Sequence, residues 1–473
     1  MKKIIFSTLA FAASLTMMGE GYQVNTLSVK QEGMGHTGVS QKLGAESMIF
    51  NPAGMGFMNN SFDLSASVSP IFATATATLE DGSKYETNND ASTPFQISGA
   101  FSIYDNLKAG ITINTPYGSG IDWTDNWPGA VLNQSVKLQV FNIQPTVAYK
   151  ILPNLSVGAG LMIAWGNIDL NKGLVNPETF DKVLASQGVT SEYFFKGTTP
   201  ASVNLKGTAE VALGFNVGAM WDINDKITVG VNYKSKMDMK VKSGDAKLTY
   251  ANEFAESQLG AITGLDNANF SAKLPAVSQL TFGVSYKPIR KLILAFDAQL
   301  SGWSAYEELD IDFLGEKLGD SFDQHLTKNY NDSWAFRFGA QYEMTKRLDL
   351  RAGFVIDNTP VDEDYFNPET PGMTRLLPSV GFSFRPTNNL SIDLAFTYVE
   401  GLARKGSNSY TDLVAAQAYQ TAYQTAIGQG ASTEMATSIA ESKANALGGI
   451  EKTFKAKYDI KALIPAIGLS YSF

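Results

Sequence analysis

Long segments in which apolar and polar residues alternate are the feature that most constrains the fold of this chain. In 280–286, Leu, Phe, Val and Tyr share one face, and Thr, Gly and Ser share the other. The same alternation recurs in 291–302, 331–343 and 347–357. An alternating run of about nine residues or more suits a tilted β-strand that crosses a bilayer. Strands of a soluble β-sandwich alternate too, but they typically contain about 5–6 residues. The pattern therefore predicts strands that span a membrane.

Segments of this kind number 14: 61–78, 94–104, 107–116, 135–149, 154–170, 203–222, 226–241, 273–286, 291–302, 331–343, 347–357, 375–385, 389–400 and 456–473. Six of their connections are short turns, the other seven are long, and the two kinds alternate strictly. Outer-membrane barrels show this asymmetry, with short periplasmic turns and long external loops. An even number of strands also closes without a free edge, as a bilayer requires. The sequence predicts an all-β fold, a 14-stranded antiparallel transmembrane β-barrel over 59–473.

Aromatic residues mark one end of this predicted barrel. Each even-numbered strand ends in an aromatic residue on the short-turn side: Tyr104, Tyr149, Trp221, Tyr286, Tyr342, Phe384, and then Tyr471 and Phe473. Amphipathic rings favour the headgroup level of a bilayer, so this set is typical of an aromatic girdle. We therefore predict a multi-pass protein of the bacterial outer membrane, in contact with its lipid.

Two segments precede the barrel. Residues 1–21 combine two lysines, a short apolar run and small residues near the end, which favours a secretory signal peptide over a buried helix. Residues 22–58 contain six glycines and few charges. Such a segment would be disordered in water unless something enclosed it. We predict that 22–58 forms a hatch inside the barrel lumen.

Composition and motifs argue against several classes of function. The net charge of −9 argues against a nucleic-acid partner. With His36 and His325 as the only histidines and no cysteine, a catalytic triad or a metal site has little to draw on. No nucleophile-elbow or P-loop motif occurs. We expect a monomer that is not an enzyme and has no cofactor or resident metal, although the acidic residues of 307–312 and 362–364 could bind divalent cations instead of forming a solvated rim.

Several motifs resemble those of the FadL/TodX family of outer-membrane transporters for long-chain fatty acids and other hydrophobic compounds. They are 21–25 (GYQVN), 51–53 (NPA), 274–276 (LPA), 295–298 (AFDA), 332–337 (DSWAFR), 350–353 (LRAG) and 359–361 (TPV). The resemblance implies a hatch within a 14-stranded barrel. It also implies that external loops capture the ligand, which passes to a lumen site near the hatch and leaves sideways through a wall gap at the third strand.

The resemblance also suggests residues of the gate. The family motif falls on Asn51, Pro52 and Ala53, which either form a structural corner or face the wall gap. A kink in the third strand is expected near Gly110 and Pro116, because both residues weaken sheet pairing. Alternatively, Pro116 only marks the end of that strand.

A fatty-acid carboxylate needs a cation in a mostly apolar pocket. Arg337, Arg351 and Arg375 share the phase of the small polar residues, so we expect them to point into the lumen. Lys328 lies near the position of a ligand-binding lysine of the family. The alternative is a ladder of balanced lumen charges, since Asp297, Asp349 and Asp393 share the same phase.

The external loops contain two predicted helical insertions, at about 176–188 and 409–447. Phe180, Leu184, Phe194 and Phe195 are candidates for a capture groove, with packing between loops as the alternative. No function follows from the second insertion. Transport of a hydrophobic compound is the leading hypothesis, with fatty acids or aromatic hydrocarbons as the ligand. A porin-like pore and an adhesin or receptor barrel are the competing ones.

Overall fold

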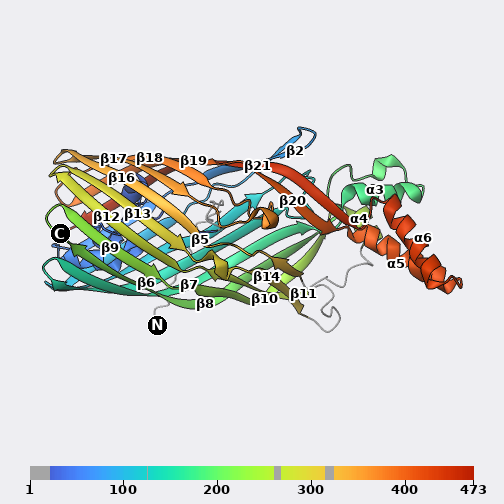
Figure 1. The fold of residues 1–473 in the computed structure, drawn as a ribbon, viewed down its shortest axis with the longest axis horizontal. Coiled ribbons are helices and arrows are strands. Elements are labelled where there is room, and N and C mark those ends of the chain that lie inside the picture. The colour runs from blue at the N-terminus through green and yellow to red at the C-terminus, as the bar shows by residue number, and fades with distance from the viewer. Residues whose placement is uncertain (1–21, 125, 260–267, 315–323) are drawn as a thin grey trace, which may run out of the picture.

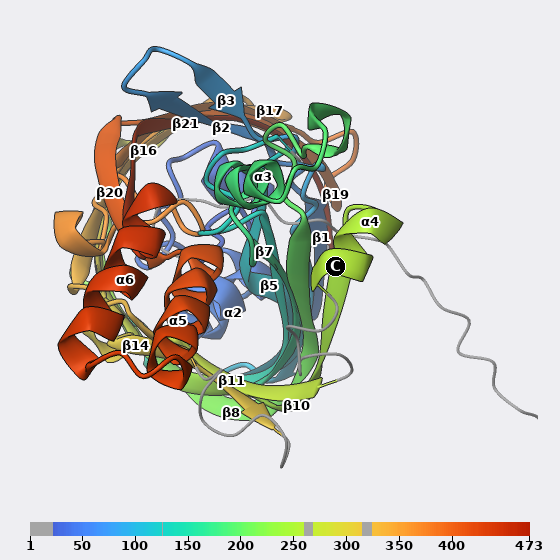
Figure 2. The same ribbon diagram turned by 90° about the vertical axis from the view of Figure 1, so that its right-hand side faces the viewer.

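The strands of the computed structural model form one antiparallel sheet that closes on itself. The structure describes residues 22–124, 126–259, 268–314 and 324–473, so the predicted signal peptide lies outside them. The first strand, β1 (Phe62–Val68), pairs with β4 (Phe95–Tyr104) on one side and with β21 (Glu451–Ser472) on the other. The first and last strands of the barrel are therefore neighbours, and Figure 2 shows the resulting ring of strands from one end.

Further wall elements are β2 (Phe72–Leu79), β5 (Leu107–Asp122), β6 (Ser135–Leu152), β7 (Leu155–Gly173), β8 (Ala201–Asp222), β9 (Ile227–Lys234), β10 (Met237–Tyr250), β11 (Ala268–Ala276), β12 (Gln279–Ile289), β13 (Leu292–Ser301), β14 (Glu308–Leu314), β15 (Gln324–Thr327), β16 (Ser333–Thr345), β17 (Leu348–Asp357), β18 (Arg375–Phe384), β19 (Leu390–Gly401) and β20 (Arg404–Thr411). Six wall strands each consist of two consecutive labelled segments separated by a short break, such as β9 and β10. β3 (Lys84–Glu86) pairs only with β2 and is not counted as a wall strand. Within the described residues this gives 14 wall strands, which confirms the predicted barrel and its N-terminal hatch.

Several strands extend further than alternation predicts. The third wall strand, β5, continues past its predicted end at residue 116 to Asp122. The interpretation of Pro116 as the end of this strand is therefore wrong. β21 begins at Glu451, not at 456, and β7 runs to Gly173. All these extensions lie on the side of the long loops (Figure 1).

The short turns gather at the opposite end of the barrel. The eight aromatic residues of the predicted girdle are 43–68% exposed there. In Figure 1 this end carries the C-terminus, whereas the external helices crowd the other end. None of the described helices is both long enough and apolar enough to cross a membrane.

The lumen has two halves of different chemistry. Along β6, buried residues pass from apolar to polar toward the short turns: Val136, Leu138, Val140, Asn142, Gln144 and Thr146. The polar half is filled by the hatch, with α1 (Val29–Glu32), η1 (Gly44–Glu46), α2 (Ser47–Phe50) and η2 (Pro52–Phe57). Figure 2 shows α2 within the ring of strands. The expectation of a polar interior therefore holds only for the half that contains the hatch.

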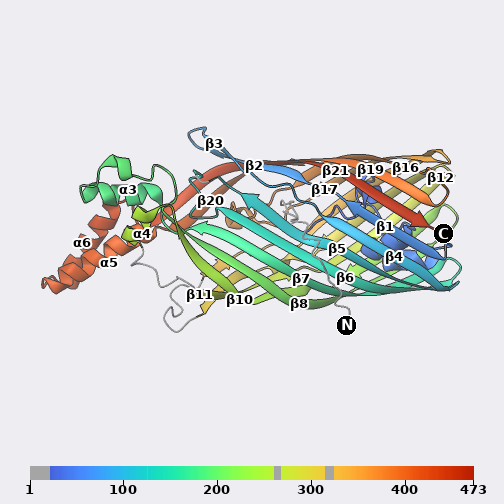
Figure 3. The ribbon, with the colours of Figure 1, turned by 180° about the vertical axis from the view of Figure 1, so that it is seen from behind.

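Helices from separate loops cap the long-loop end. They are α3 (Pro177–Ser186), η3 (Ser191–Tyr193), α4 (Glu253–Leu259), η6 (Glu363–Tyr365), α5 (Leu413–Gly428) and α6 (Thr433–Ala446), whereas η4 (Trp303–Ala305) lies in the break between β13 and β14. α5 and α6 form a hairpin whose contact is lined by small buried residues, including Ala426, Ala436 and Ala440. Figures 1 and 3 show this hairpin projecting beyond the barrel.

Candidate functional site

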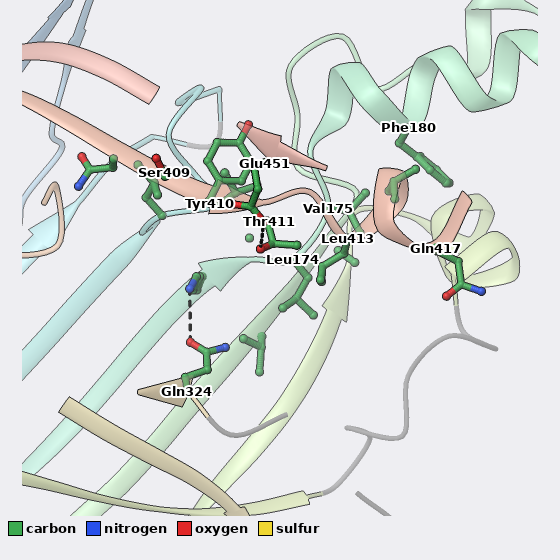
Figure 4. A pocket seen from close by; sticks show the side chains of 18 of the residues that line it. Leu174, Val175, Phe180, Gln324, Ser409, Tyr410, Thr411, Leu413, Gln417 and Glu451 are labelled. Carbon is green, nitrogen blue, oxygen red and sulfur yellow. Dashed lines mark hydrogen bonds between the residues drawn. The ribbon is translucent and has the colours of Figure 1, made fainter. Parts of the chain in front are cut away.

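An outer cavity of about 1170 Å³ lies among the external loops. α3 contributes Phe180 and Leu184 to its lining, and α5 contributes Leu413. Lys172 at the end of β7 and Lys328 next to β15 also line it. Figure 4 shows the apolar side chains of both helices beside the polar residues Gln324 and Glu451. The lining thus combines apolar side chains of α3 and α5 with many polar and charged ones, and a concave site of this kind can hold an amphiphilic small molecule.

Some of the predicted loop residues line the outer cavity, and others pack behind its lining. Phe180 and Leu184 line the cavity. Phe195 packs against Phe180 with ring centroids 5.5 Å apart, and Phe194 packs against the same cluster. Lys328 forms an ion pair of 2.9 Å with Glu369, which raises the pKa of the lysine despite the cost of its burial. The sequence predicts the helical insertion that contains α5, but it does not show that α5 and Lys172 line this cavity, because contacts between distant loops leave no local signal.

A buried polar cluster fixes α5 next to α3. Asp412 is the N-cap of α5 and accepts hydrogen bonds from the backbone N–H groups of Val414 and Ala415. The same carboxylate accepts a 2.6 Å hydrogen bond from Thr179 of α3 and forms a 2.7 Å ion pair with Lys452 of β21. One side chain thus joins two loops to the wall.

Replacing Asp412 with alanine is expected to loosen the helical hairpin without unfolding the barrel. Loss of an N-cap costs about 0.5–2 kcal/mol, and a buried Lys452 left without its partner adds to that cost. Limited proteolysis should show faster cleavage within 413–446, while the heat-resistant barrel band persists on gels. Glu441→Ala, at an exposed position within α6, is the matched control and should be cleaved like the wild type.

Buried aromatic side chains pack in the lumen below the outer cavity. Trp123 and Trp127 stack with centroids 4.3 Å apart. Deeper in the lumen, the ring of Tyr22 meets those of Tyr117, Trp303 and Tyr306 at centroid distances of 6.2, 5.0 and 6.0 Å, respectively. These rings belong to one buried apolar cluster in the outer half of the lumen, between the outer cavity and the hatch. A ligand that moves from the cavity toward the hatch would therefore contact apolar side chains.

The wall is interrupted at β5. Pairing between β4 and β5 ends at Asn114, and the register between β5 and β6 shifts between Asn114 and Tyr117, around Pro116. Beyond this point the hatch replaces β4 as the neighbour of β5. The N–H of Val24 donates to the carbonyl of Pro116 at 2.9 Å, and the N–H of Gly118 donates to the carbonyl of Tyr22 at 2.8 Å. Figure 3 shows β4, β5 and β6 side by side. Gly110 lies below this break and pairs regularly with both neighbours, so it does not form a kink.

Wall glycines form the seat of the hatch. Gly158, Gly218, Gly230, Gly283, Gly339, Gly353 and Gly381 face hatch atoms from β7 round to β18. A Cβ atom at Gly158 would lie 2.5 Å from the carbonyl carbon of Pro52, and one at Gly353 would overlap the backbone of Gly35. The hatch main chain thus lies directly on the main chain of the wall, as only glycine permits.

The motif Asn51–Pro52–Ala53 is part of this seat. Asn51 accepts a 3.1 Å hydrogen bond from the N–H of Ala53. Its amide donates to the carbonyl of Val39 at 2.8 Å and to that of Ala219 on β8 at 3.0 Å. The corner packs on β7 at Gly158 and on β8 at Gly218. These contacts favour the structural interpretation of the motif.

The three lumen arginines have different partners. Arg375 forms a buried ion pair with Asp357. Arg351 lies 3.7 Å from Asp349 and donates to Gln341 and Ser383. These two arginines fit the predicted ladder of balanced charges. Within the described residues, no carboxylate lies within 4.0 Å of Arg337, which donates instead to Asn25 of the hatch at 3.4 Å.

Docking of the hatch should weaken as the pH rises. Glu32 of α1 is buried and accepts hydrogen bonds from Ser69 at 2.8 Å and Thr397 at 3.3 Å. Burial raises the pKa of its carboxyl from 4.5 to about 8. The docked state therefore keeps a proton that the released state loses. As the pH rises from 4.5 to about 8, docking of the hatch becomes less favourable. Cleavage of the hatch by a protease should be faster above this window than below it, and Glu32→Gln should remove the difference.

Comparisons with known proteins agree with this architecture. The family described as outer membrane protein transport protein (OMPP1/FadL/TodX) matches residues 9–473. Outer membrane protein P1 of Haemophilus influenzae is 25% identical over 63% of this chain and 64% of its own length, just under two thirds. A long-chain fatty acid transport protein of Escherichia coli O6:H1 is 24% identical over 63% of this chain and 67% of its own length. A Pseudomonas aeruginosa FadL homologue shares the fold, with a TM-score of 0.74 at 19% identity, covering 96% of this chain and 100% of that one.

The family match covers nearly the whole chain and therefore identifies the class of protein. Members of this family are transport channels of the outer membrane, not enzymes. The barrel, the hatch and the apolar outer cavity described above are consistent with that role. The chain therefore belongs to the FadL/TodX family of outer-membrane transporters of hydrophobic compounds.

Proposed function

We propose that this protein takes up long-chain fatty acids and releases them sideways into the outer membrane. The observation that carries the proposal is the apolar cluster in the outer half of the lumen, which lies between the outer cavity and the hatch and includes Tyr117 at the break in β5. Each CH₂ group gains about 0.8 kcal/mol in apolar surroundings, so an alkyl chain should follow this cluster. The filled lower half favours a lateral exit over an aqueous pore.

We assign most of the predicted site residues a role along this route. Phe180 and Leu184 would capture the alkyl chain, supported by Phe194 and Phe195, and Lys328 would attract its carboxylate. Pro116 would hold open the exit, whereas Gly110, Asn51, Pro52 and Ala53 would seat the hatch below it. A single barrel contains the whole route, so we propose that a monomer suffices.

Uptake of labelled oleate by cells that lack other fatty-acid transporters tests the proposal. Expression of this chain should raise the rate well above that of the empty strain, and planar bilayers containing the purified protein should show no steady ion current. A steady current without oleate uptake would indicate a porin-like pore. Native mass spectrometry of the purified protein would identify a ligand that remains bound.

Aromatic hydrocarbons are the second candidate class of ligand. The cluster of Tyr22, Tyr117, Trp303 and Tyr306 would receive a flat ring by edge-to-face contacts, each worth about 0.5–1.5 kcal/mol. Competition between toluene and oleate in the same uptake assay separates the two classes. Only a protein that prefers aromatic ligands would lose oleate uptake completely at modest toluene concentrations.

A further inference from the structure

Exposed cations gather on one side of the barrel rim, at the end of the short turns. They lie in or beside three turns, those between β8 and β9, between β12 and β13, and between β16 and β17. We call this set the basic arc: Lys226, Lys287, Arg290, Lys291, Lys346 and Arg347. Its members are far apart in the sequence, and the closed wall brings their strands side by side (Figure 1).

Backbone hydrogen bonds join these three turns to one another. The N–H of Lys287 donates to the carbonyl of Lys226 at 2.8 Å, and the N–H of Glu343 donates to the carbonyl of Lys291 at 2.8 Å. Both bonds lie where neighbouring strands enter their turns. Since neighbouring strands lie about 4.8 Å apart, the arc from β9 to β17 covers on the order of 20 Å of the rim. The cations therefore form one continuous surface.

The charge of the basic arc is largely unbalanced. In the part of the chain that the structure describes, no member of the arc forms an ion pair. Asp222 lies nearby but is paired with Lys42 at 2.5 Å. Asp225 and Glu343 are the remaining acids in or beside these turns, so they offset two of the positive charges. A partner with negative charge would therefore be attracted to this surface.

The short turns on the other side of the ring have a different character. They are 105–106, 153–154 and 385–389. Arg385 is the one cation within them, and it pairs with the buried Asp349. Lys150, beside the second of these turns, has its Nζ 5.9 Å from the ring centroid of Phe57 in the hatch. Positive charge is therefore concentrated on one side of the rim and is not a general property of the short turns.

Apolar side chains place the basic arc at the level of the lipid headgroups. Each of its turns follows a ring of the aromatic girdle: Trp221, Tyr286 or Tyr342. Each turn also presents an apolar side chain that is about half exposed: Ile223 (46%), Ile289 (57%) and Met344 (52%). Such side chains are favourable in the interface of a bilayer and costly in the water beyond it. The cations therefore lie among headgroups and do not project freely into the periplasm.

We propose that the basic arc binds the headgroups of anionic phospholipids in the periplasmic leaflet and collects them on one side of the barrel. Arg290 and Arg347 can each donate two parallel hydrogen bonds to a phosphate, and the lysines add charge. A cluster of this size beside a membrane is typical of anionic-lipid binding. The inference goes beyond the proposed function, because it does not depend on which ligand the protein transports.

The test offers the purified full-length protein phosphatidylglycerol and phosphatidylcholine with the same acyl chains, at one lipid of each kind per barrel. Native mass spectrometry then measures the ratio of the two lipids that remain bound. The wild type should retain mainly phosphatidylglycerol. Lys287→Gln with Arg290→Gln and Lys291→Gln should lower this ratio at least about tenfold, since each cation beside a membrane strengthens the attraction about fivefold.

A matched control removes the same charge at the other end of the barrel. Lys84→Gln with Lys196→Gln and Lys455→Gln, all at exposed positions, should keep the wild-type ratio. Lys287→Arg with Lys291→Arg conserves the charge of the arc and should also keep it.

Three results would overturn the proposal. One is an unchanged ratio in the glutamine variant of the arc when its heat-resistant band on gels shows that the barrel is folded. Another is an equal fall of the ratio in the control variant, which would make net charge the cause. The third is equal retention of the two lipids by the wild type, which would leave an acidic periplasmic protein as the partner of the arc.

Discussion

Replacing Gly353 with alanine is expected to release the hatch and convert the closed barrel into a conducting pore. A Cβ atom at this position would overlap the backbone nitrogen of Gly35, and its cross-strand neighbour Gly339 faces the backbone of Met34. The wall cannot retreat, because closed strand pairing holds it on both sides. The hatch must therefore move. Overpacking of about 1–3 kcal/mol would raise the undocked population about 5- to 150-fold.

Planar bilayer recordings measure this effect directly. The wild type should show almost no current, Gly353→Ala should show discrete openings, and Gly339→Ala with Gly353→Ala should stay open for longer. Gly99→Ala is the matched control, since its methyl group would meet only the side chain of Leu64 at 3.8 Å. A silent Gly353→Ala barrel of native mobility on gels would show that the glycine seat does not hold the hatch in place.

Alternation predicts the wall well because lipid imposes it. Where a strand faces lipid on one side and the polar half of the lumen on the other, its lipid-facing residues are mostly apolar and its lumen-facing residues are mostly small or polar, as in β12 and β13. The predicted strands stop short where this contrast ends. The residues beyond them are mostly glycine or polar, as in 117–122 (YGSGID), 171–173 (NKG) and 451–455 (EKTFK). β20 is polar on both faces, and its pairing with β21 leaves no signature in the hydrophobic pattern.

The candidate site was predictable only in part. The alternation of inward and outward residues alone places the side chains of Arg337, Arg351 and Arg375 in the lumen. Their partners depend on strand register and on the hatch. Asp357 reaches Arg375 from the neighbouring strand, whereas Asp297, opposite Arg337, accepts hydrogen bonds from the hatch N–H groups of Gly38 and Val39 with one of its two oxygens. Contacts between distant segments, such as those of α5 with α3, have no local sequence signal.

A disulfide between residues 23 and 117 is expected to stop uptake reversibly if the ligand leaves at β5. Gln23 and Tyr117 face each other across an antiparallel bridge. The flanking hydrogen bonds, from Val24 to Pro116 and from Gly118 to Tyr22, make them a non-hydrogen-bonded pair. Such pairs have Cα atoms about 4.5 Å apart, within the range that a disulfide spans. The natural chain has no cysteine, so the introduced pair has no competitor.

The oxidised double variant, Gln23→Cys with Tyr117→Cys, would tie the hatch to the edge of β5 and close the exit covalently. Oleate uptake should fall to the level of the empty strain and recover after reduction. Each single cysteine variant controls for the lost side chain and should not respond to reductant. The cross-link leaves the outer cavity unchanged, so capture of oleate should persist while its release stops. Uptake at the wild-type rate by a fully cross-linked protein would place the exit elsewhere, since a covalent bond across this opening cannot yield on the timescale of transport.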